Sequence, residues 1–180
     1  IPKKGTPQGG IISPLLANIC MNEFDWWLSN QWETFKTEYK YCNLSNRYRS
    51  LKKSNLKEFY FVRYADDFKI FCKDYETARK LFIGSKMWLK DRLGLEISEE
   101  KSKITNIRKN YTEFLGFKLK GIINKNKVVC ISKMNDKAKK KVIKNIKNQV
   151  KKIQKKTNIR EVSKLNGIIL GMHNYYKIAT

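Results

Sequence analysis

The sequence predicts an α+β fold, in which helices cover one face of a small antiparallel sheet. Two observations support this prediction. Short runs of aromatic and branched residues, which are typical of strands, flank turn-length polar segments. Longer segments between these runs carry apolar residues at the three- and four-residue spacing of an amphipathic helix. Hairpins that alternate with helices in this way are typical of the α+β class.

The charge of the chain indicates a polyanionic partner. The 180 residues carry 39 Lys and Arg against 16 Asp and Glu, for a formal net charge of +23. Such a surface attracts nucleic acid first and an anionic membrane surface second. No run of residues is apolar and long enough to span a membrane, and no signal peptide is visible, so we expect no membrane insertion.

The cysteines and the histidine argue against two common kinds of site. The four cysteines are widely spaced without a C-x-x-C pair, and His173 is the only histidine. A structural zinc site and a histidine-based nucleophile triad are therefore not expected, and the thiols fit a reducing compartment. The chain begins at Ile1, and residues 1–10 have the pattern of a loop that enters a helix, so we expect a piece of a longer protein.

The first predicted element is a helix that follows a glycine-rich loop. Residues 5–10 need backbone freedom, while Ser13 can cap the helix and Pro14 suits its first turn. The helix should run to about Leu28 with one apolar face. Glycine loops before helices often approach phosphates, but the ending of a Walker motif is absent, and a plain tight turn is the competing interpretation.

Residues 29–57 give a weaker pattern. Three aromatic residues and a cysteine recur at helical spacing, which predicts a second helix over 32–42; they are Trp32, Phe35, Tyr39 and Cys42. We interpret the basic stretch from Asn43 to Lys57 as a flexible excursion between two core elements. Its mixture of cations and aromatic rings is typical of nucleic-acid contacts, and a solvated loop explains it equally well.

Residues 60–72 predict a hairpin whose turn carries two adjacent acids. Strand-like runs flank the segment from Tyr64 to Asp67, where the chain reverses. Tight hairpins favour Gly or Asn at the turn, and Ala65-Asp66 is a poor substitute. A turn that places Asp66 beside Asp67 at this cost is typical of a site, and paired carboxylates suit Mg²⁺ and two-metal phosphoryl transfer. The competing interpretation is a solvated turn without a ligand.

A helix and two short strands should follow this hairpin. Asp74 caps a predicted helix that runs to about Leu93, and Gly94 stops it. Short apolar runs predict strands at 95–97 and 104–107.

A second hairpin begins over residues 113–118 and returns over 128–131, across a polar turn at 124–126. The order of helix, hairpin, helix and strand matches most of a ferredoxin-like unit that lacks its opening strand.

The last quarter of the chain predicts a lysine-rich helical bundle. Residues 132–180 hold 14 Lys and Arg against two acids, and apolar residues recur at helical spacing over 138–153 and 159–172. Nearly uniform positive charge favours contacts with phosphate over a merely solvated face. We therefore divide the chain into residues 1–131 and 132–180.

Four segments resemble conserved blocks of reverse transcriptases, in the order and at the spacing of that family. They are the Gly5–Gly10 loop with the helix start Ser13–Ile19, the hairpin Phe61–Phe68 with its Y-x-D-D pattern, the segment Leu93–Ile104, and Phe114–Phe117. The motif sequences are most similar to those of group II intron maturases, namely V-R-Y-A-D-D-F, G-T-P-Q-G-G and S-P-L-L-A-N-I. The helical tail resembles the thumb of these maturases. The resemblance covers nearly the whole chain and is weakest over 29–57.

The resemblance implies a partial polymerase palm over 1–131 and a small basic helical thumb over 132–180. Asp66 and Asp67 match the catalytic, metal-binding carboxylates of the family, with Asp66 the more direct ligand. Mg²⁺ is the implied cofactor, with Mn²⁺ as its alternative.

Further roles follow from the same match. Gln8 and Gly9 would line the pocket for the template and the incoming nucleotide, and Tyr64 and Ala65 would pack near the primer end. Lys101 matches a catalytic position that assists the departure of pyrophosphate, and a surface lysine is the competing interpretation. The implied primer grip is Phe114, Leu115, Gly116 and Phe117. The implied contacts to the nucleic-acid backbone are Lys139, Lys140, Lys144, Lys147 and Lys151.

The implied function is that of the RNA-directed DNA polymerase of a group II intron, with a second role in intron RNA binding and splicing. Its partners would be the intron RNA, a template–primer duplex and dNTPs, in the bacterial cytoplasm or in an organelle. The sequence gives no indication of a homo-oligomer. The other catalytic aspartate of the family lies upstream of Pro7-Gln8-Gly9, so we expect these 180 residues alone to extend a primer poorly or not at all.

Two other functions remain as alternatives. One is an RNA-binding splicing factor with a vestigial polymerase site, against which the intact Asp66–Asp67 pair argues. The other is a different enzyme on a similar palm, such as a nucleotidyl cyclase, against which the basic tail and the Pro-Gln-Gly block argue.

Overall fold

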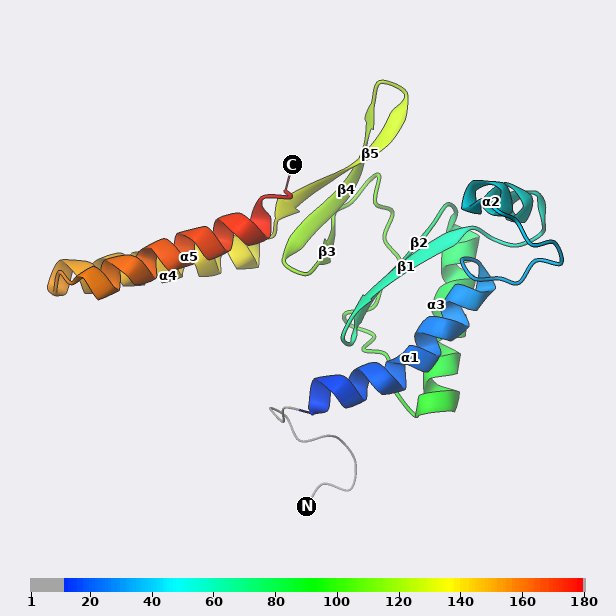
Figure 1. Ribbon diagram of the computed structural model, residues 1–180, viewed down its shortest axis with the longest axis horizontal. Helices are drawn as coiled ribbons and strands as arrows, with labels where there is room; N and C mark the ends of the chain where they lie inside the picture. The colour runs from blue at the N-terminus through cyan, green and yellow to red at the C-terminus, as the bar shows by residue number, and fades with distance from the viewer. Residues whose placement is uncertain (1–11, 180) are drawn as a thin grey trace, which may run out of the picture. The chain divides into compact units, whose positions relative to one another are not determined.

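An antiparallel hairpin forms the centre of the first part of the chain. The computed structural model describes residues 12–179, and in it β1 (Phe59–Tyr64) pairs with β2 (Asp67–Cys72) (Figure 1). Side chains alternate between the two faces of a strand, so cross-strand partners such as Phe61 and Ile70 share a face. That face packs into the core, whereas Val62 lies on the opposite, exposed face. The predicted hairpin is confirmed.

Two long helices cover the apolar face of this hairpin. α1 (Ser13–Gln31) contacts β1, α3 (Tyr75–Leu93) contacts β2, and the two helices contact each other. Phe24 and Leu28 of α1 are fully buried, and the ring of Phe24 packs on that of Phe68 with centroids 5.1 Å apart. The mixed helix and sheet composition confirms the predicted α+β class.

The ends of the two helices agree only in part with the sequence analysis. Ser13 is already inside α1, and the residue before it, Ile12, occupies the capping position, so the predicted Ser13 cap is wrong. At the start of α3, Asp74 Oδ1 accepts a hydrogen bond from the Thr77 amide at 2.7 Å, and this bond holds the pKa of Asp74 below its ordinary value. Gly94 ends α3 with φ of 64°, as predicted.

The predicted helix over residues 32–42 does not form. Trp32 takes a non-helical backbone, with φ of −148°, while its side chain is fully buried. Phe35 and Tyr39, which would continue the apolar stripe, are 37% and 67% exposed. Because a short helix is stabilised mainly by burying one face, the helical spacing of these rings is not sufficient to form one.

A helix forms instead in the stretch interpreted as a flexible excursion, over α2 (Leu44–Lys53). Leu51 is buried in the core shared with α1 and β1. The ring of Tyr48 stacks on that of Trp32, with centroids 6.3 Å apart. These two anchors, one turn apart, hold α2 in place, so the flexible interpretation of 43–57 is wrong for most of its length.

A three-stranded antiparallel sheet begins the second part of the chain. Its order is β3 (Thr112–Phe114), β4 (Phe117–Asn124), β5 (Lys127–Met134). Lys125 and Asn126 join β4 to β5 with φ of 43° and 64°, the left-handed backbone that a two-residue hairpin turn favours. The second predicted hairpin is confirmed for β4 and β5, whereas its predicted start over 113–118 is divided by a further turn between Phe114 and Phe117.

The strands predicted at 95–97 and 104–107 do not form. Ile97 packs instead against the core of the first part of the chain, and the carbonyl of Ile107 accepts one hydrogen bond from the Gly121 amide at 2.9 Å. One such bond is not a ladder. Within residues 12–179 the hairpins therefore belong to two separate sheets, and the single ferredoxin-like sheet that we expected is absent there.

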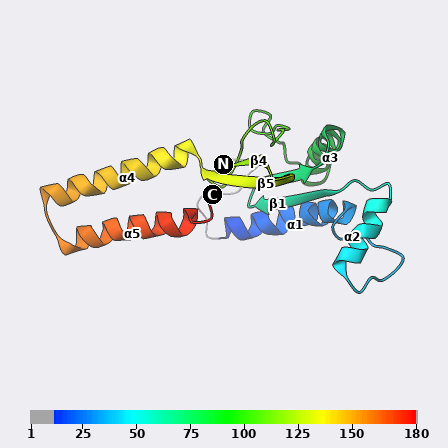
Figure 2. The same ribbon diagram turned by 90° about the horizontal axis from the view of Figure 1, so that it is seen from above.

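Two helices complete the chain as an antiparallel pair, α4 (Asp136–Lys155) and α5 (Ile159–Tyr176) (Figure 2). The buried side chain of Gln149 joins them, because its Nε2 donates to the carbonyl and the carboxylate of Glu161 at 2.9 and 2.8 Å. Both predicted helices are confirmed. Across residues 12–179, every helix is too short or too polar to cross a membrane.

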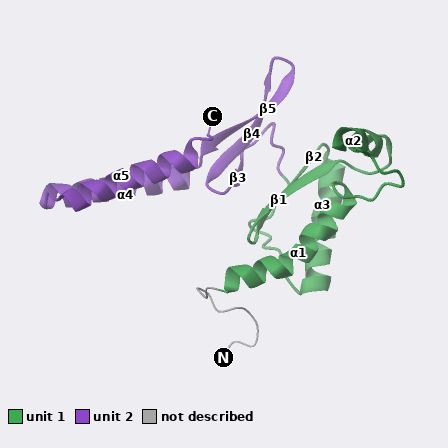
Figure 3. Ribbon diagram, viewed as in Figure 1, with its two compact units in different colours: residues 1–104 green, residues 105–180 purple. Residues whose placement is uncertain are grey.

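The chain forms two compact units, residues 1–104 and 105–180 (Figure 3). Residues 105–131 are thus part of the compact unit that contains the helical pair. The palm–thumb boundary expected at 131/132 differs from this division into compact units, and it stays a prediction.

Candidate functional site

The two acids at the tip of the β1–β2 hairpin lie at a two-residue turn, Asp66 within it and Asp67 at the start of β2. Tyr64 pairs with Asp67, so the turn residues between the strands are Ala65 and Asp66. Ala65 has φ of 54°, a left-handed backbone that costs an Ala about 1 kcal/mol relative to Gly. The strained position that the sequence suggested is therefore present, and it lies directly before the two carboxylates.

Arg63 links this turn to α1. Its guanidinium forms a bidentate ion pair with Asp25, in which Nε donates to Oδ1 at 2.7 Å and NH2 donates to Oδ2 at 2.6 Å. NH1 donates to Asn18 Oδ1 at 3.0 Å and to the carbonyl of Ala65 at 2.6 Å. The hydrogen bonds to Asp25 raise the pKa of Arg63, which stays charged. One side chain thus fixes both the helix and the strained turn residue.

The carboxylates of both acids are exposed to solvent. Asp66 and Asp67 are exposed, and the register places Asp67 on the face of the hairpin that carries Tyr64 and Val62. Carboxylate oxygens are the ligands that Mg²⁺ prefers. Residues 12–179 contain no group of three or more His, Cys, Asp or Glu side chains placed to hold a metal, so these two acids fit a metal only as part of a larger ligand set.

The structure does not test the predicted roles of three other site residues. Gln8 and Gly9, with the rest of the glycine-rich loop, lie outside the described residues. Lys101 is exposed in a turn, where its amide donates to the Ser98 carbonyl at 3.3 Å. Its catalytic role stays a prediction.

The predicted primer grip is the turn between β3 and β4. Phe114 pairs with Phe117, so Leu115 and Gly116 form a two-residue turn, with φ of 48° and 80°. Hydrogen bonds from outside the turn reach the carbonyls of both turn residues. The Leu115 carbonyl accepts from the Tyr175 hydroxyl at 2.9 Å, and the Gly116 carbonyl accepts from the Asn135 amide at 2.8 Å.

The tyrosines at the end of α5 also pack against this turn. The ring of Phe117 lies 5.6 Å from that of Tyr175 and 5.1 Å from that of Tyr176. A Cβ added at Gly116 would lie 2.9 Å from the Tyr176 hydroxyl oxygen, so a larger residue there would force Tyr176 to shift. The β3–β4 turn and the last turn of α5 therefore form one packed cluster.

The lysines predicted to contact a nucleic-acid backbone are all exposed on α4. Four of them recur at intervals of four, three and four residues, which places them along one side of the helix. This row spans about 16 Å at the rise of an α-helix. The five predicted residues are Lys139, Lys140, Lys144, Lys147 and Lys151.

Sequence reasoning missed the partners that hold the site. Arg63 occupies the apolar face of β1, after Phe59 and Phe61, and a cation in that register is a signal for a buried acid. That signal does not identify Asp25. Tyr175 lies in the helical tail, and no local pattern links it to Leu115, which lies 60 residues away.

Comparisons with known proteins match most of this chain. Residues 1–119 match the family described as reverse transcriptase (RNA-dependent DNA polymerase). Protein YkfC of Escherichia coli is 32% identical and the group II intron-encoded protein LtrA of Lactococcus lactis is 30% identical, each over 64% of this chain. The putative COX1/OXI3 intron 2 protein of Saccharomyces cerevisiae is 29% identical over 64% of this chain. The matches span 32%, 26% and 17% of those three proteins.

We predict that Arg63→Ala destabilises the chain by about 2–3 kcal/mol, because it leaves the Asp25 carboxylate half-buried without its partner. Arg92→Ala is the matched control, since its ion pair with Glu23 is exposed and should contribute under about 1 kcal/mol. Chemical denaturation of the purified chain, followed by circular dichroism, measures both. Equal losses for the two variants would contradict a special role for Arg63.

We also predict that Gly116→Ala destabilises the 105–180 unit by more than about 1 kcal/mol, because the left-handed backbone and the Tyr176 hydroxyl both oppose a Cβ. Gly167→Ala lies within α5 with nothing within 4 Å of the new Cβ, and it should instead stabilise by about 0.5–1 kcal/mol. Thermal unfolding of the two variants provides the comparison. The same sign for both changes would show that the geometry at Gly116 is unimportant.

Proposed function

We propose that this chain, which belongs to the reverse transcriptase (RNA-dependent DNA polymerase) family, supplies part of the active site of an enzyme that copies RNA into DNA. The group II intron-encoded relative and the yeast intron protein confirm the resemblance that the four sequence blocks indicate. The chain spans less than a third of the length of these relatives, so the activity of the whole protein is part of the proposal.

The observation that carries the proposal is the pair of exposed carboxylates on a turn anchored by Arg63. A polymerase joins the 3′ hydroxyl of a primer to the α-phosphate of a dNTP, and pyrophosphate leaves. The negatively charged carboxylates of Asp66 and Asp67 would bind the metal cations beside the reacting groups, with Asp66 the more direct ligand. The Arg63 contacts reduce the freedom of the turn, so the backbone that carries the two carboxylates is held in place before substrate arrives.

Mg²⁺ is the proposed cofactor, with Mn²⁺ as an alternative. When bound, the metal ions would lower the pKa of the primer hydroxyl and neutralise charge on the departing pyrophosphate. Asp66 and Asp67 provide only part of a ligand set, since the described residues contain no group of three metal-binding side chains. We propose that a further carboxylate, from outside residues 12–179, completes it.

The remaining roles concern nucleic acid. The β3–β4 turn, Phe114–Phe117, would steady the primer strand, and its packing against Tyr175 supports this by making the turn rigid. The lysine row of α4 would contact the phosphate backbone of the template–primer duplex. Tyr64 and Ala65 would lie near the primer end, Gln8 and Gly9 near the incoming nucleotide, and Lys101 near the pyrophosphate. The partial palm would comprise 1–131 and the thumb 132–180.

We further propose that the parent protein binds intron RNA and assists splicing, in the bacterial cytoplasm or in an organelle. The positive charge of the chain and the printed names of the relatives support this role. The alternative is an RNA-binding splicing factor without polymerase activity, which the exposed lysines of α4 alone would satisfy. The paired acids, held at a strained turn, favour the enzyme.

We predict that Asp66→Asn in the full-length parent protein lowers dNTP incorporation by at least about a hundredfold and leaves RNA splicing intact, because it removes a metal ligand and no RNA contact. Asp91→Asn, which removes the same charge from the exposed surface of α3, is the matched control and should retain both activities. Primer extension and a splicing assay measure the two functions. If Asp66→Asn abolishes splicing as well, the division of roles is wrong.

For the lysine row, we predict that Lys144→Gln with Lys147→Gln lowers the salt slope of duplex binding by about 1.8, since each phosphate contact contributes about 0.9. Lys80→Gln with Lys90→Gln removes two equally exposed charges from α3 and should leave the slope unchanged. Fluorescence anisotropy with a labelled duplex, over a range of salt concentrations, gives the slopes. A flat salt response of the unmodified chain would count against α4 as the contact surface.

A further inference from the structure

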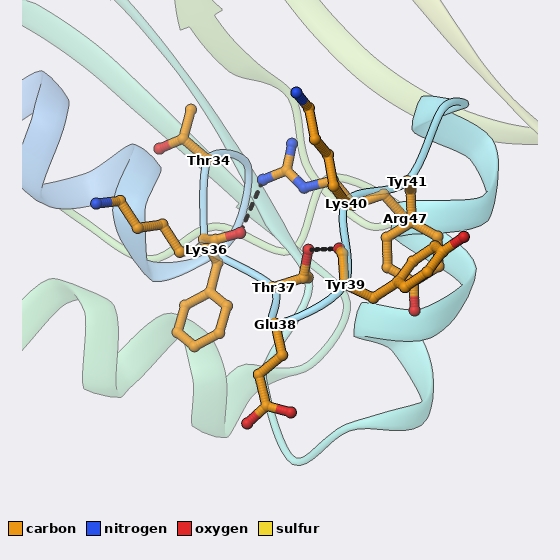
Figure 4. A pocket seen from close by; sticks show the side chains of 9 residues that line it. Thr34, Lys36, Thr37, Glu38, Tyr39, Lys40, Tyr41 and Arg47 are labelled. Carbon is orange, nitrogen blue, oxygen red and sulfur yellow. Dashed lines mark hydrogen bonds between the residues drawn. The ribbon is translucent and has the colours of Figure 1, made fainter.

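A shallow cavity that is wide open to solvent lies in the first unit, apart from the carboxylate turn, and has no role in the function proposed above. It has a volume of about 320 Å³ and is lined by residues 34–41 and Arg47 of α2 (Figure 4). It falls in the stretch where the resemblance to reverse transcriptases is weakest. We call residues 34–41 together with Arg47 the tyrosine–arginine surface.

The backbone of this surface is held in place at several points. Arg47 NH2 donates to the Phe35 carbonyl at 3.0 Å, and Thr37 Oγ1 donates to the Tyr39 carbonyl at 2.7 Å (Figure 4). The Thr34 amide donates to the Ser29 carbonyl at 2.8 Å, at the end of α1. Because α2 is itself anchored in the core through Leu51, the cavity and its lining are formed before any ligand binds.

An aromatic pair stands at the surface of this cavity. The rings of Tyr39 and Tyr41 meet edge to face, with centroids 4.9 Å apart and an interplanar angle of 70°. Tyr39 is 67% exposed, so its ring is not part of the core. A tyrosine ring that is braced by a second ring and open to solvent is the kind of platform on which an unpaired base stacks.

Three cations share the lining of this cavity with the aromatic pair. Lys36 and Lys40 are exposed and line the cavity with Arg47, against the single acid Glu38. In the view of Figure 4, Lys40 and Glu38 extend from opposite sides of the loop. The adjoining helix α2 carries two Arg and two Lys and no acid. Lys52 of α2 is paired with Glu58 at 3.0 Å, so the cations that line the cavity itself, Lys36, Lys40 and Arg47, are the ones available to a phosphate backbone.

We propose that the tyrosine–arginine surface binds a single-stranded segment of RNA, with one base stacked on Tyr39 and phosphates held by Lys36, Lys40 and Arg47. Duplex RNA fits this surface poorly, because its bases are stacked on one another and their faces are not available to a protein ring. The choice of RNA over DNA rests on the proposed function. The stacking and the charge contacts do not, since no polymerase step is involved.

The first test is binding of a labelled, unstructured RNA of roughly ten nucleotides to the purified 180-residue chain, measured by fluorescence anisotropy. Tyr39→Ala should weaken binding by about tenfold, because one base loses its stacking partner, while Tyr39→Phe, which keeps the ring, should stay within about twofold. Tyr75→Ala is the matched control, since Tyr75 is 66% exposed at the start of α3 and does not line the cavity. Equal affinities for Tyr39→Ala and the unmodified chain would overturn the proposal.

A second test addresses the charges and does not depend on the Tyr39 variants. Lys36→Gln with Lys40→Gln should lower the salt slope for the single strand by about 1.4, since each phosphate contact contributes about 0.7 on single strands. The α3 pair, Lys80→Gln with Lys90→Gln, should leave the slope unchanged. An identical slope for the Lys36 and Lys40 double variant and the unmodified chain would overturn the phosphate contacts.

A third test locates the bound strand. Photo-crosslinking with 4-thiouridine RNA should label the tryptic peptides 37–40 and 41–47, which carry the two tyrosines. Crosslinks confined to α4 and α5 would overturn this proposal and leave the proposed function intact. Conversely, crosslinks at 37–47 together with full polymerase activity of Asp66→Asn would support this surface while the proposed catalytic role fails.

Discussion

One guanidinium group connects the catalytic candidate residues to the core of the first unit. Arg63 occupies the apolar face of β1, where a charged group is stable only if its hydrogen-bonding capacity is met. Asp25 of α1 accepts hydrogen bonds from Nε and NH2, and NH1 donates both to Asn18 of α1 and to the carbonyl of Ala65. The hairpin is therefore fixed relative to α1 in one register. Because Ala65 directly precedes Asp66, the same contacts define where the two carboxylates stand.

Local patterns predicted the elements that local chemistry determines. Asp74 and Gly94 delimit α3 through a side-chain cap and a left-handed residue, and both effects can be recognised from a few neighbouring residues. In residues 32–57, tertiary packing rather than local pattern determines the structure. The spacing of Trp32 and Tyr39 is helical, yet one ring is buried and the other is exposed, and only the tertiary core decides which.

The candidate site divides in the same way. The adjacent acids and the Phe114–Phe117 turn could be found from short motifs, because each is contiguous in the sequence. Their supports could not, since Arg63 lies 38 residues from Asp25 and Tyr175 lies 60 residues from Leu115. Contacts at such separations depend on how helices and strands pack. A cation on an apolar strand face was the one sequence signal that such a partner existed.

The cluster at the base of the helical pair has a mechanical consequence. Tyr175 and Tyr176 belong to the last turn of α5, and they contact Leu115, Gly116 and Phe117 directly. Gln149 ties α4 to the start of α5, so the two helices tilt as one body. A change in the tilt of α4 and α5 relative to the sheet would therefore either move the β3–β4 turn with it or break these contacts.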